Sequence, residues 1–284
     1  MQTATSLEVL RSAVAELRRG GKRLALVPTM GALHEGHLTL VREARRHADA
    51  VAVSIFVNPK QFGPNEDLDA YPRRMAADSA LLEGEGVELL WAPTVEAMYP
   101  AGFATNVGVT GVSEGLCGAA RPGHFDGVAT VVLKLFNQVA PDVALFGEKD
   151  WQQLAVIRRM ARDLDLTAPH VDAIVGVPTV REEDGLALSS RNQYLSPAAR
   201  AQAAALPQAM REAIAALAAG SAVSPTLAAL EAHLLQAGYD SVDYATLADA
   251  QSLVTLDQLG DAPARLLVAA RIGGTRLIDN MAAR

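Results

Sequence analysis

Cysteine is almost missing from this chain, since Cys117 is the only one among 284 residues. A single thiol cannot form an internal disulfide and is too little for a structural zinc site. We therefore expect a reducing compartment and predict a cytoplasmic protein. Long apolar runs are also lacking: the first residues show no signal-peptide block, and no later stretch approaches the ~20 apolar residues that cross a bilayer. The sequence predicts no membrane partner.

The chain has fewer positive than negative side chains. The chain has 25 Lys and Arg against 32 Asp and Glu, a formal net charge of −7. Binding to nucleic acid needs clustered basic side chains, so we expect no nucleic-acid partner. A small local basic pocket is still compatible with this net charge. Half of the residues are hydrophobic, which is ample for a packed core.

Several catalytic signatures are missing as well. The sequence contains no G-x-x-x-x-G-K-[ST] loop, and no G-x-G-x-x-G follows its first apolar run. These absences argue against a P-loop kinase and a classical dinucleotide site. Nothing supports covalent catalysis by Cys117 or by a G-x-S-x-G serine.

Short apolar runs alternate with segments of helical spacing. The runs cover residues 24–27, 50–57, 87–91, 143–146 and 171–175, and the clearest helical pattern covers 127–140. This alternation predicts a parallel sheet with helical crossovers. We expect residues 1–184 to form an α/β, doubly wound, Rossmann-like nucleotide-binding domain whose ligands bind at the carboxyl ends of the strands.

The composition changes after residue 192. An alanine-rich stretch begins with Ser196 as the expected N-cap and Pro197 at the first helical position, and it closes at Gly220 as one predicted helix. Strands are expected at 241–247, 265–272 and 275–281, with a hairpin turn between the last two. Residues 185–284 thus predict a smaller α+β domain, which we expect to act as a lid.

Two histidines stand at a predicted strand-to-helix joint, in "PTMGALHEGH". Gly36 lets a ligand approach the backbone, and free amides at a helix start favour anions. His34 and His37 would add hydrogen-bond donors to such a phosphate cradle. The alternative is that both histidines merely cap the helix or lie on its exposed face. A zinc site is disfavoured, because helical ligand pairs use i and i+4 spacing.

A second strand-glycine-helix stretch, "LFGEKDWQQL", repeats this design. Lys149 can hold a phosphate as a point charge, and Asp150 or nearby amides can hold ribose hydroxyls. Both can also be ordinary turn and capping residues. Gln152 and Gln153 cannot both point to the core, so one of them is expected to face the cleft.

A third stretch, "LALSSRNQYLS", places two hydroxyls and a guanidinium in a row where the composition changes. Ser189, Ser190 and Arg191 fit a mobile phosphate clamp, and equally a polar linker. Two further polar stretches, "FVNPKQFGPNEDLDAYPR" and "RPGHFDGV", are expected to be a loop and a helix start.

These five stretches, in this order, resemble the pantothenate synthetase (pantoate–β-alanine ligase) family. The family belongs to the nucleotidylyl transferases, whose H-x-G-H signature is shared with class I aminoacyl-tRNA synthetases. The resemblance implies a two-step reaction. Pantoate and ATP would give pantoyl adenylate and pyrophosphate, and β-alanine would then give pantothenate and AMP.

The resemblance also implies roles for particular residues. His37, His34, Lys149 and Arg191 would be catalytic, with His37 the usual proton donor. Gln61 and Gln153 would bind pantoate, and Gln61 also β-alanine. The implied ATP-binding residues are Met30, Gly31, Ala32, Leu33, His34, Glu35, Gly36, His37, Gly147, Glu148, Lys149, Asp150, Val180, Leu188, Ser189, Ser190 and Arg191.

Magnesium is expected with ATP, although the motifs do not give its protein ligands and Asp78 is one candidate. Homodimers are usual in this family, so we expect one here. Another nucleotidylyl transferase and a non-catalytic nucleotide-binding regulator are the alternative functions. A tRNA-charging enzyme is disfavoured because no tRNA-binding module is evident.

Overall fold

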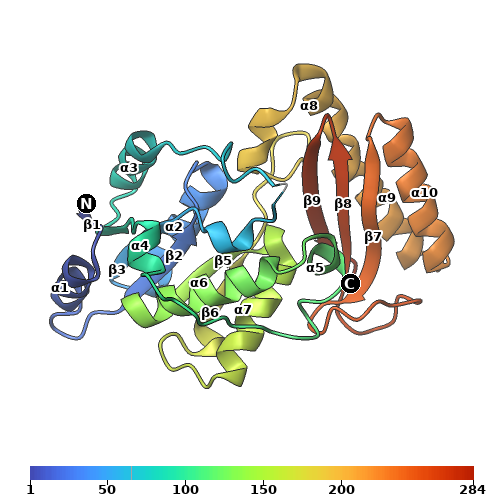
Figure 1. Ribbon diagram of the computed structural model, residues 1–284. Helices are drawn as coiled ribbons and strands as arrows, with labels where there is room; N and C mark the ends of the chain where they lie inside the picture. The colour runs from blue at the N-terminus through green and yellow to red at the C-terminus, as the bar shows by residue number, and fades with distance from the viewer. Residues whose placement is uncertain (65) are drawn as a thin grey trace.

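The computed structural model describes residues 1–64 and 66–284, and it contains two sheets that stand side by side (Figure 1). The larger sheet has the strand order β1-β4-β3-β2-β5-β6, and all its pairings are parallel. Its strands are β1 (Gln2–Ala4), β2 (Leu24–Thr29), β3 (Ala50–Ile55), β4 (Leu89–Trp91), β5 (Val143–Gly147) and β6 (Ile174–Val177).

Helices cover both faces of this sheet. They are α1 (Leu7–Leu17), α2 (Glu35–His47), α3 (Met75–Gly84), α4 (Val95–Met98), α5 (Leu116–Ala120), α6 (His124–Val139) and α7 (Trp151–Asp163). Leu24 and Leu26 of β2 lie in one apolar cluster with residues of α1, α6 and α7, whereas Ala25 and Val27 pack with residues of α2 and α3. Because both faces are buried, the central strands are apolar throughout, and the predicted doubly wound α/β domain is confirmed.

Two details of the predicted sheet were wrong. The run 171–175 begins as a 3₁₀ turn, Val171–Ala173, and the strand occupies Ile174–Val177 instead. The three-residue strand β1 was not predicted, because so short a segment carries no pattern of its own. It is a strand only because β4 pairs with it.

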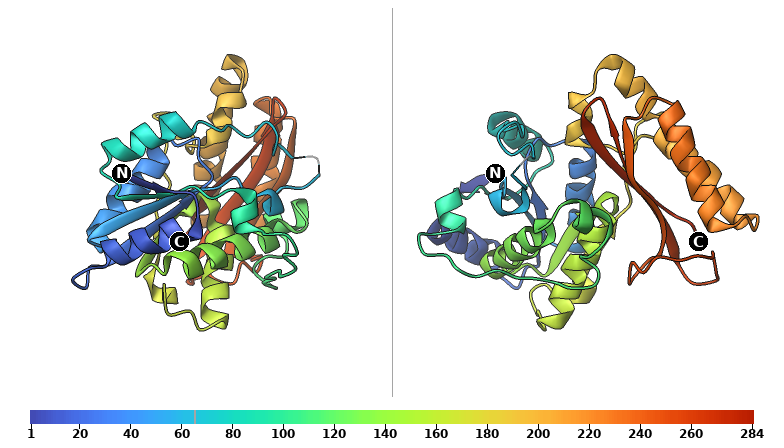
Figure 2. Two further views of the ribbon diagram at one scale, coloured as in Figure 1. Left: turned by 60° about the vertical axis from the view of Figure 1, so that its left-hand side comes forward. Right: turned by 45° about the vertical axis from the view of Figure 1, so that its right-hand side comes forward.

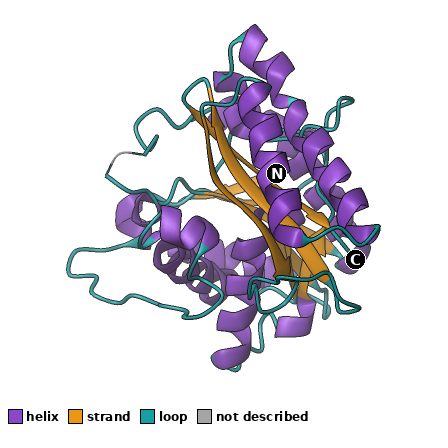
Figure 3. Ribbon diagram, turned by 90° about the vertical axis from the view of Figure 1, so that its right-hand side faces the viewer, coloured by secondary structure: helices purple, strands orange, loops and turns teal. Residues whose placement is uncertain are grey.

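The second sheet is antiparallel and contains β7 (Ser241–Asp249), β8 (Ala264–Ile272) and β9 (Thr275–Ala282). The predicted hairpin is confirmed, with Ile272 paired to Thr275 across the two glycines. The helices of this region, α8 (Pro197–Ala203), α9 (Ala205–Ala218) and α10 (Val223–Gln236), build a separate apolar cluster with the sheet (Figure 3).

The single helix expected from Pro197 to Gly220 is divided into α8 and α9 at Ala204. Pro207 has no amide hydrogen to give to the carbonyl of Ala203, four residues earlier. The hydroxyl of Tyr239 donates to that carbonyl instead, at 2.9 Å. The helical content was therefore predicted correctly, and the break was missed.

The two sheets are joined closely. Arg181, which follows β6, forms an ion pair of 2.7 Å with the buried Asp279 of β9, and Leu186 already packs in the C-terminal apolar cluster. Figure 2 shows the C-terminal sheet beside the green and yellow helices of the first domain. Among the described residues, no helix is both long and apolar enough to span a membrane.

Candidate active site

Four strands of the parallel sheet end at the same cavity. The segments that follow β2, β3, β5 and β6 all line it, as expected at the carboxyl edge of such a sheet. Most of the predicted site residues are among its lining residues: Met30, His34, Gly36, His37, Gln61, Gly147, Lys149, Asp150, Gln153, Val180, Leu188, Ser189, Ser190 and Arg191. Segments far apart in the sequence thus meet around one space.

The turn after β2 is held from behind by Asp78 of α3. The carboxylate accepts hydrogen bonds from the amides of Ala32 and Leu33, both at 2.9 Å. Gly31 and Ala32 have φ angles of 84° and 51°, so the chain turns sharply here. Gly31, Ala32, Leu33 and Asp78 lie behind the cavity and do not line it. Both carboxylate oxygens of Asp78, the candidate metal ligand, therefore accept hydrogen bonds from the backbone.

His34 and His37 form the start of α2. The Nδ1 atom of His34 accepts from the amide of Gly36 at 3.1 Å, and Nδ1 of His37 accepts from the amide of His34 at 3.3 Å. The ring centroids are 4.1 Å apart. A Cβ on Gly36 would lie 2.9 Å from the His34 ring, so this reciprocal cap needs glycine there. The histidines cap the helix and also line the cavity.

Both imidazoles are neutral at pH 7. Burial, with a smaller effect of Lys149, lowers the pKa of His34 to about 4. Burial, together with the adjacent His34, lowers the pKa of His37 to about 3. Since each Nδ1 accepts a hydrogen bond, the ring proton resides on Nε2. The pair offers two neutral N–H donors. Glu35 does not line the cavity and pairs with Arg42 at the surface.

The turn after β5 is held by the C-terminal sheet. Asn280 of β9 donates from Nδ2 to the carbonyl oxygens of Glu148 and Lys149, each at 2.9 Å. Lys149 Nζ lies 3.7 Å from a carboxylate oxygen of Asp150. Glu148 does not line this cavity and pairs with Arg265 at 3.0 Å.

The Ser-Ser-Arg segment contacts the loop that follows β3. Arg191 donates to both oxygens of Asp67, at 2.8 and 3.1 Å. The hydroxyls of Tyr71 and Ser190 are 3.3 Å apart. This segment is therefore fixed by side chains from a loop that is distant in sequence.

A second arginine is held in the same way. Arg121 forms two hydrogen bonds of 2.6 Å with Glu66 and also contacts Nε2 of His124 at 2.9 Å. His124 donates from Nδ1 to the carbonyl of Gln61 at 2.8 Å. Burial and the adjacent Arg121 lower the pKa of His124 to about 4. The sequence analysis did not identify Glu66 and Asp67, because acidic residues in a polar loop carry no distinguishing pattern.

The glutamines are arranged as the sequence required. Gln152 is buried, accepts from the amide of Cys117 at 3.0 Å and donates to the carbonyl of Val112 at 3.1 Å, whereas Gln153 lines the cavity. Gln61 is 9% exposed and accepts a hydrogen bond of 3.0 Å from Asn58.

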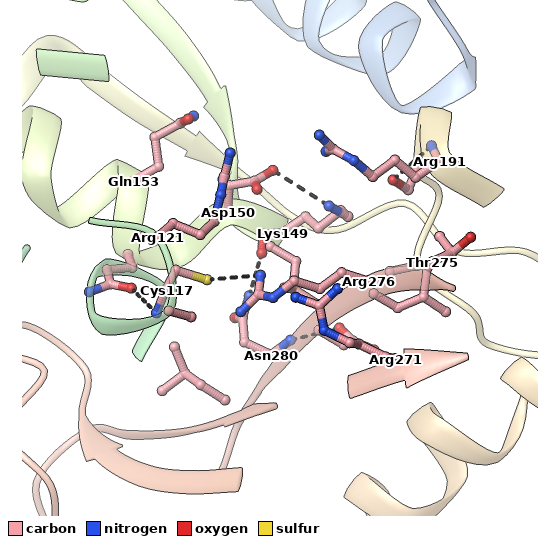
Figure 4. Close-up of a pocket in the computed structure, with 18 of the residues that line it drawn as sticks. Cys117, Arg121, Lys149, Asp150, Gln153, Arg191, Arg271, Thr275, Arg276 and Asn280 are labelled. Atoms are coloured by element: carbon pink, nitrogen blue, oxygen red, sulfur yellow. Dashed lines mark hydrogen bonds and ion pairs between the residues drawn. The ribbon is translucent and has the colours of Figure 1, made fainter. Parts of the chain in front are cut away.

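A second cavity, shown in Figure 4, shares lining residues with the first. Arg121, Lys149, Asp150, Gln153 and Arg191 line both cavities, and the opposite wall of the second is made by the β8–β9 hairpin. No group of three or more His, Cys, Asp or Glu residues with the geometry of a metal site occurs among residues 1–64 and 66–284.

A doubly wound sheet with neutral imidazoles, a lysine and a Ser-Ser-Arg segment around one cavity defines a nucleotide-using α/β enzyme. The family model described as Pantoate-beta-alanine ligase matches residues 2–282. The chain belongs to this family, and it is an ATP-dependent ligase that joins pantoate to β-alanine.

Relatives and solved structures agree with this assignment over the whole chain. The pantothenate synthetase of Novosphingobium aromaticivorans is 73% identical over 99% of this chain and 98% of its own length. A crystal structure of the pantothenate synthetase from Thermus thermophilus has a TM-score of 0.93 at 48% identity, covering 100% and 99% of the two chains. A Francisella tularensis pantoate-beta-alanine ligase, complexed with beta-gamma ATP and beta-alanine, has a TM-score of 0.83 at 32% identity, covering 100% and 98%.

Proposed function

We propose that the cavity at the carboxyl edge of the parallel sheet binds ATP beside pantoate and forms a pantoyl adenylate. The observation that carries this proposal is the gathering of His34, His37, Lys149 and the 189–191 segment around one space. All of them are hydrogen-bond donors or cations. They suit a triphosphate whose negative charge shifts as a bond to the α-phosphorus breaks.

The chemistry of adenylation explains why hydrogen-bond donors and cations are sufficient for catalysis. A carboxylate is a poor acylating agent, because its leaving group would be oxide. When the pantoate carboxylate attacks the α-phosphorus, the bond to the bridging oxygen breaks and pyrophosphate leaves. The neutral amine of β-alanine then attacks the acyl carbon, AMP departs with the bonding electrons, and the nitrogen releases a proton. The protein must position the reactants and neutralise charge, and it needs no nucleophile of its own.

We assign hydrogen-bond donation, and not proton transfer, to His37. Its pKa of about 3 leaves it neutral near pH 7, and its Nδ1 is occupied by the amide of His34. The Nε2–H groups of His34 and His37 then act as fixed donors to phosphate oxygens. Lys149 adds a positive charge, and Arg191 adds one when it leaves Asp67.

Pantoate is assigned to Gln61 and Gln153, whose amides can bind its hydroxyls and carboxylate. Gln61 lies between Asn58 and Met30, with its Nε2 atom 3.1 Å from the Met30 sulfur. Both glutamines line the cavity that also contains the histidines. Val180 lines the same cavity, and we assign its backbone to binding the adenine.

The residues fit a magnesium ion that arrives with ATP. Asp150 is the sole carboxylate among the described residues that line the nucleotide cavity, and Mg²⁺ typically takes one or two carboxylates with phosphates and water. Asp150 would hold the ion, or the ribose as the family resemblance implies. When bound, the ion would neutralise phosphate charge.

We also propose a lid, a homodimer and a cytoplasmic location. Residues 185–284 would act as a lid on residues 1–184, supported by the position of β9 against the turn that carries Lys149. The family resemblance supports a homodimer, and a biosynthetic enzyme with a single cysteine suits the cytoplasm.

Isotope exchange tests the proposed function. Purified protein with ATP, magnesium and pantoate should exchange labelled pyrophosphate into ATP, and it should release AMP steadily only when β-alanine is added. Exchange that ignores pantoate would contradict the assignment. Binding of ATP without any exchange would indicate a nucleotide-binding regulator.

A further inference from the structure

The second cavity has a wall that the adenylation step does not use. Arg271, Thr275 and Arg276 of the β8–β9 hairpin line it, whereas Asp150 and Gln153 belong to both cavities (Figure 4). A short molecule in the second cavity can thus have one end at the hairpin and the other at the boundary with the nucleotide cavity.

The charges around this second cavity do not cancel. Three lining cations each have one carboxylate partner: Arg121 with Glu66, Arg191 with Asp67, and Lys149 with Asp150. Arg271 and Arg276, in contrast, share Asp243, at 3.4 and 2.6 Å. Within the described part of the chain, these two hairpin arginines and Asp243 of β7 together carry one positive charge in excess.

Arg276 is also incompletely hydrogen-bonded. Its Nε donates to Asp243, its Nη1 meets only the Cys117 sulfur at 3.5 Å, and its Nη2 is buried with no partner. A buried charged donor without an acceptor is unusual, because it has lost its hydrogen bonds to water and has made none in return. The side chain is 15% exposed, so a ligand can reach the guanidinium from its open edge.

We propose that Arg276, with Arg271 beside it, binds the carboxylate of β-alanine. This proposal rests on the proposed function and identifies where its second substrate is recognised. The unpartnered Nη2 of Arg276 would donate to this carboxylate, and Thr275 lines the same wall. The single excess charge matches one carboxylate and not a pyrophosphate, which carries several charges.

The position of the reacting amine supports this orientation. The amine must meet the acyl group in the nucleotide cavity, so the carboxylate at the other end of β-alanine points away from it. Gln61, which the resemblance assigns to β-alanine, is a neutral amide engaged with Asn58 and Met30. It can orient the amine but provides no counter-charge for a buried carboxylate.

The test compares two amines in the complete enzyme. Arg276→Gln should raise the KM for β-alanine by about tenfold or more, as expected when a charge-assisted hydrogen bond is lost. Pantoate-dependent pyrophosphate exchange should stay within twofold of the unsubstituted enzyme. The preference for β-alanine over its neutral amide, β-alaninamide, should largely disappear, which a merely structural role would not cause.

Further variants should change the KM for β-alanine by smaller amounts. Arg276→Lys retains the charge and should recover part of the preference, and it decides the question if Arg276→Gln does not fold. Arg271→Gln should raise the KM by a smaller factor, because 48% of its side chain is exposed and water screens it. Arg159→Gln, an exposed arginine of α7 that does not line either cavity, is the matched control.

An unchanged KM and an unchanged preference in folded Arg276 variants would overturn the proposal. Equal loss of exchange and of pantothenate synthesis would also overturn it, because the residue would then be structural. Failure of the proposed function looks different: the unsubstituted enzyme itself would show no pantoate-dependent exchange.

Discussion

The two sides of the nucleotide cavity are held in place by different forces. On the sheet side, His34 and His37 are fixed by backbone amides and are neutral. On the loop side, Arg121 and Arg191 are fixed by ion pairs with Glu66 and Asp67. In the proposed function, substrate anions would use the histidines without rearrangement, whereas each arginine would first exchange its carboxylate partner. The sheet side is therefore preorganised, and the loop side is suited to respond to substrate.

The largest expected effect comes from breaking the preorganised side. His37→Ala removes a fixed donor and should lower adenylation by about 100-fold or more, as expected for a lost oxyanion-type donor. Pyrophosphate exchange measures the loss, and circular dichroism checks the fold. His47→Ala, at the far end of the same helix, is the control. Near-normal turnover of His37→Ala would reduce this histidine to a helix cap.

Low pH should destabilise the folded protein through the same two histidines. The pKa values of His34 and His37 are about 4 and 3 in the folded protein, below the ordinary 6.5 of an unfolded chain. The folded state thus binds fewer protons, and this contribution to stability is complete above pH 6.5. It is lost as the pH falls toward 4 and then 3, by on the order of 1 kcal/mol per pH unit for each histidine.

Urea unfolding at pH 7, 6 and 5 measures this slope. Replacing both histidines by asparagine retains a side-chain acceptor near each Nδ1 position and removes both titrations. The slope should then become shallower, with His124 supplying part of what remains. The same slope in the double variant would show that the two rings do not cause the acid sensitivity.

The smallest expected effect tests the loop side. Asp67→Asn removes the charge that holds Arg191 at 2.8 Å and frees the guanidinium for phosphate. The KM for ATP should fall by about two- to fivefold, within the range of a partly exposed ion pair. Asp69→Asn, an exposed carboxylate of the same loop, is the control. A raised KM would mean that Asp67 positions Arg191 for binding.

Much of this architecture could be predicted from sequence because local patterns dictate it. The apolar runs that became β2, β3 and β5 are buried on both faces, and the glycine pair before Thr275 marks the hairpin. The gathering of the histidines, Lys149 and the Ser-Ser-Arg segment was available from the family resemblance. Each motif alone was compatible with an ordinary cap, turn or linker.

Other features had no local signal. The pairing of β1 with β4 joins residues 87 positions apart. The break at Ala204 needed knowledge of Pro207 and of Tyr239 from another element. Asp78 was considered only as a metal ligand, and its hydrogen bonds to the turn after β2 were not foreseen. Asn280 and Arg276 resemble any surface residue of their type until the fold brings them beside the cavities.

The sequence by itself determined the parallel sheet, the antiparallel hairpin and the chemical groups that the cavity contains, because hydrophobic period and turn residues act over a few positions. Only the tertiary structure decided that the histidines are neutral donors, that two arginines are held by carboxylates and that one hairpin carries an excess charge. Burial and charge pairing depend on neighbours far apart in the chain, and only folding brings these neighbours together.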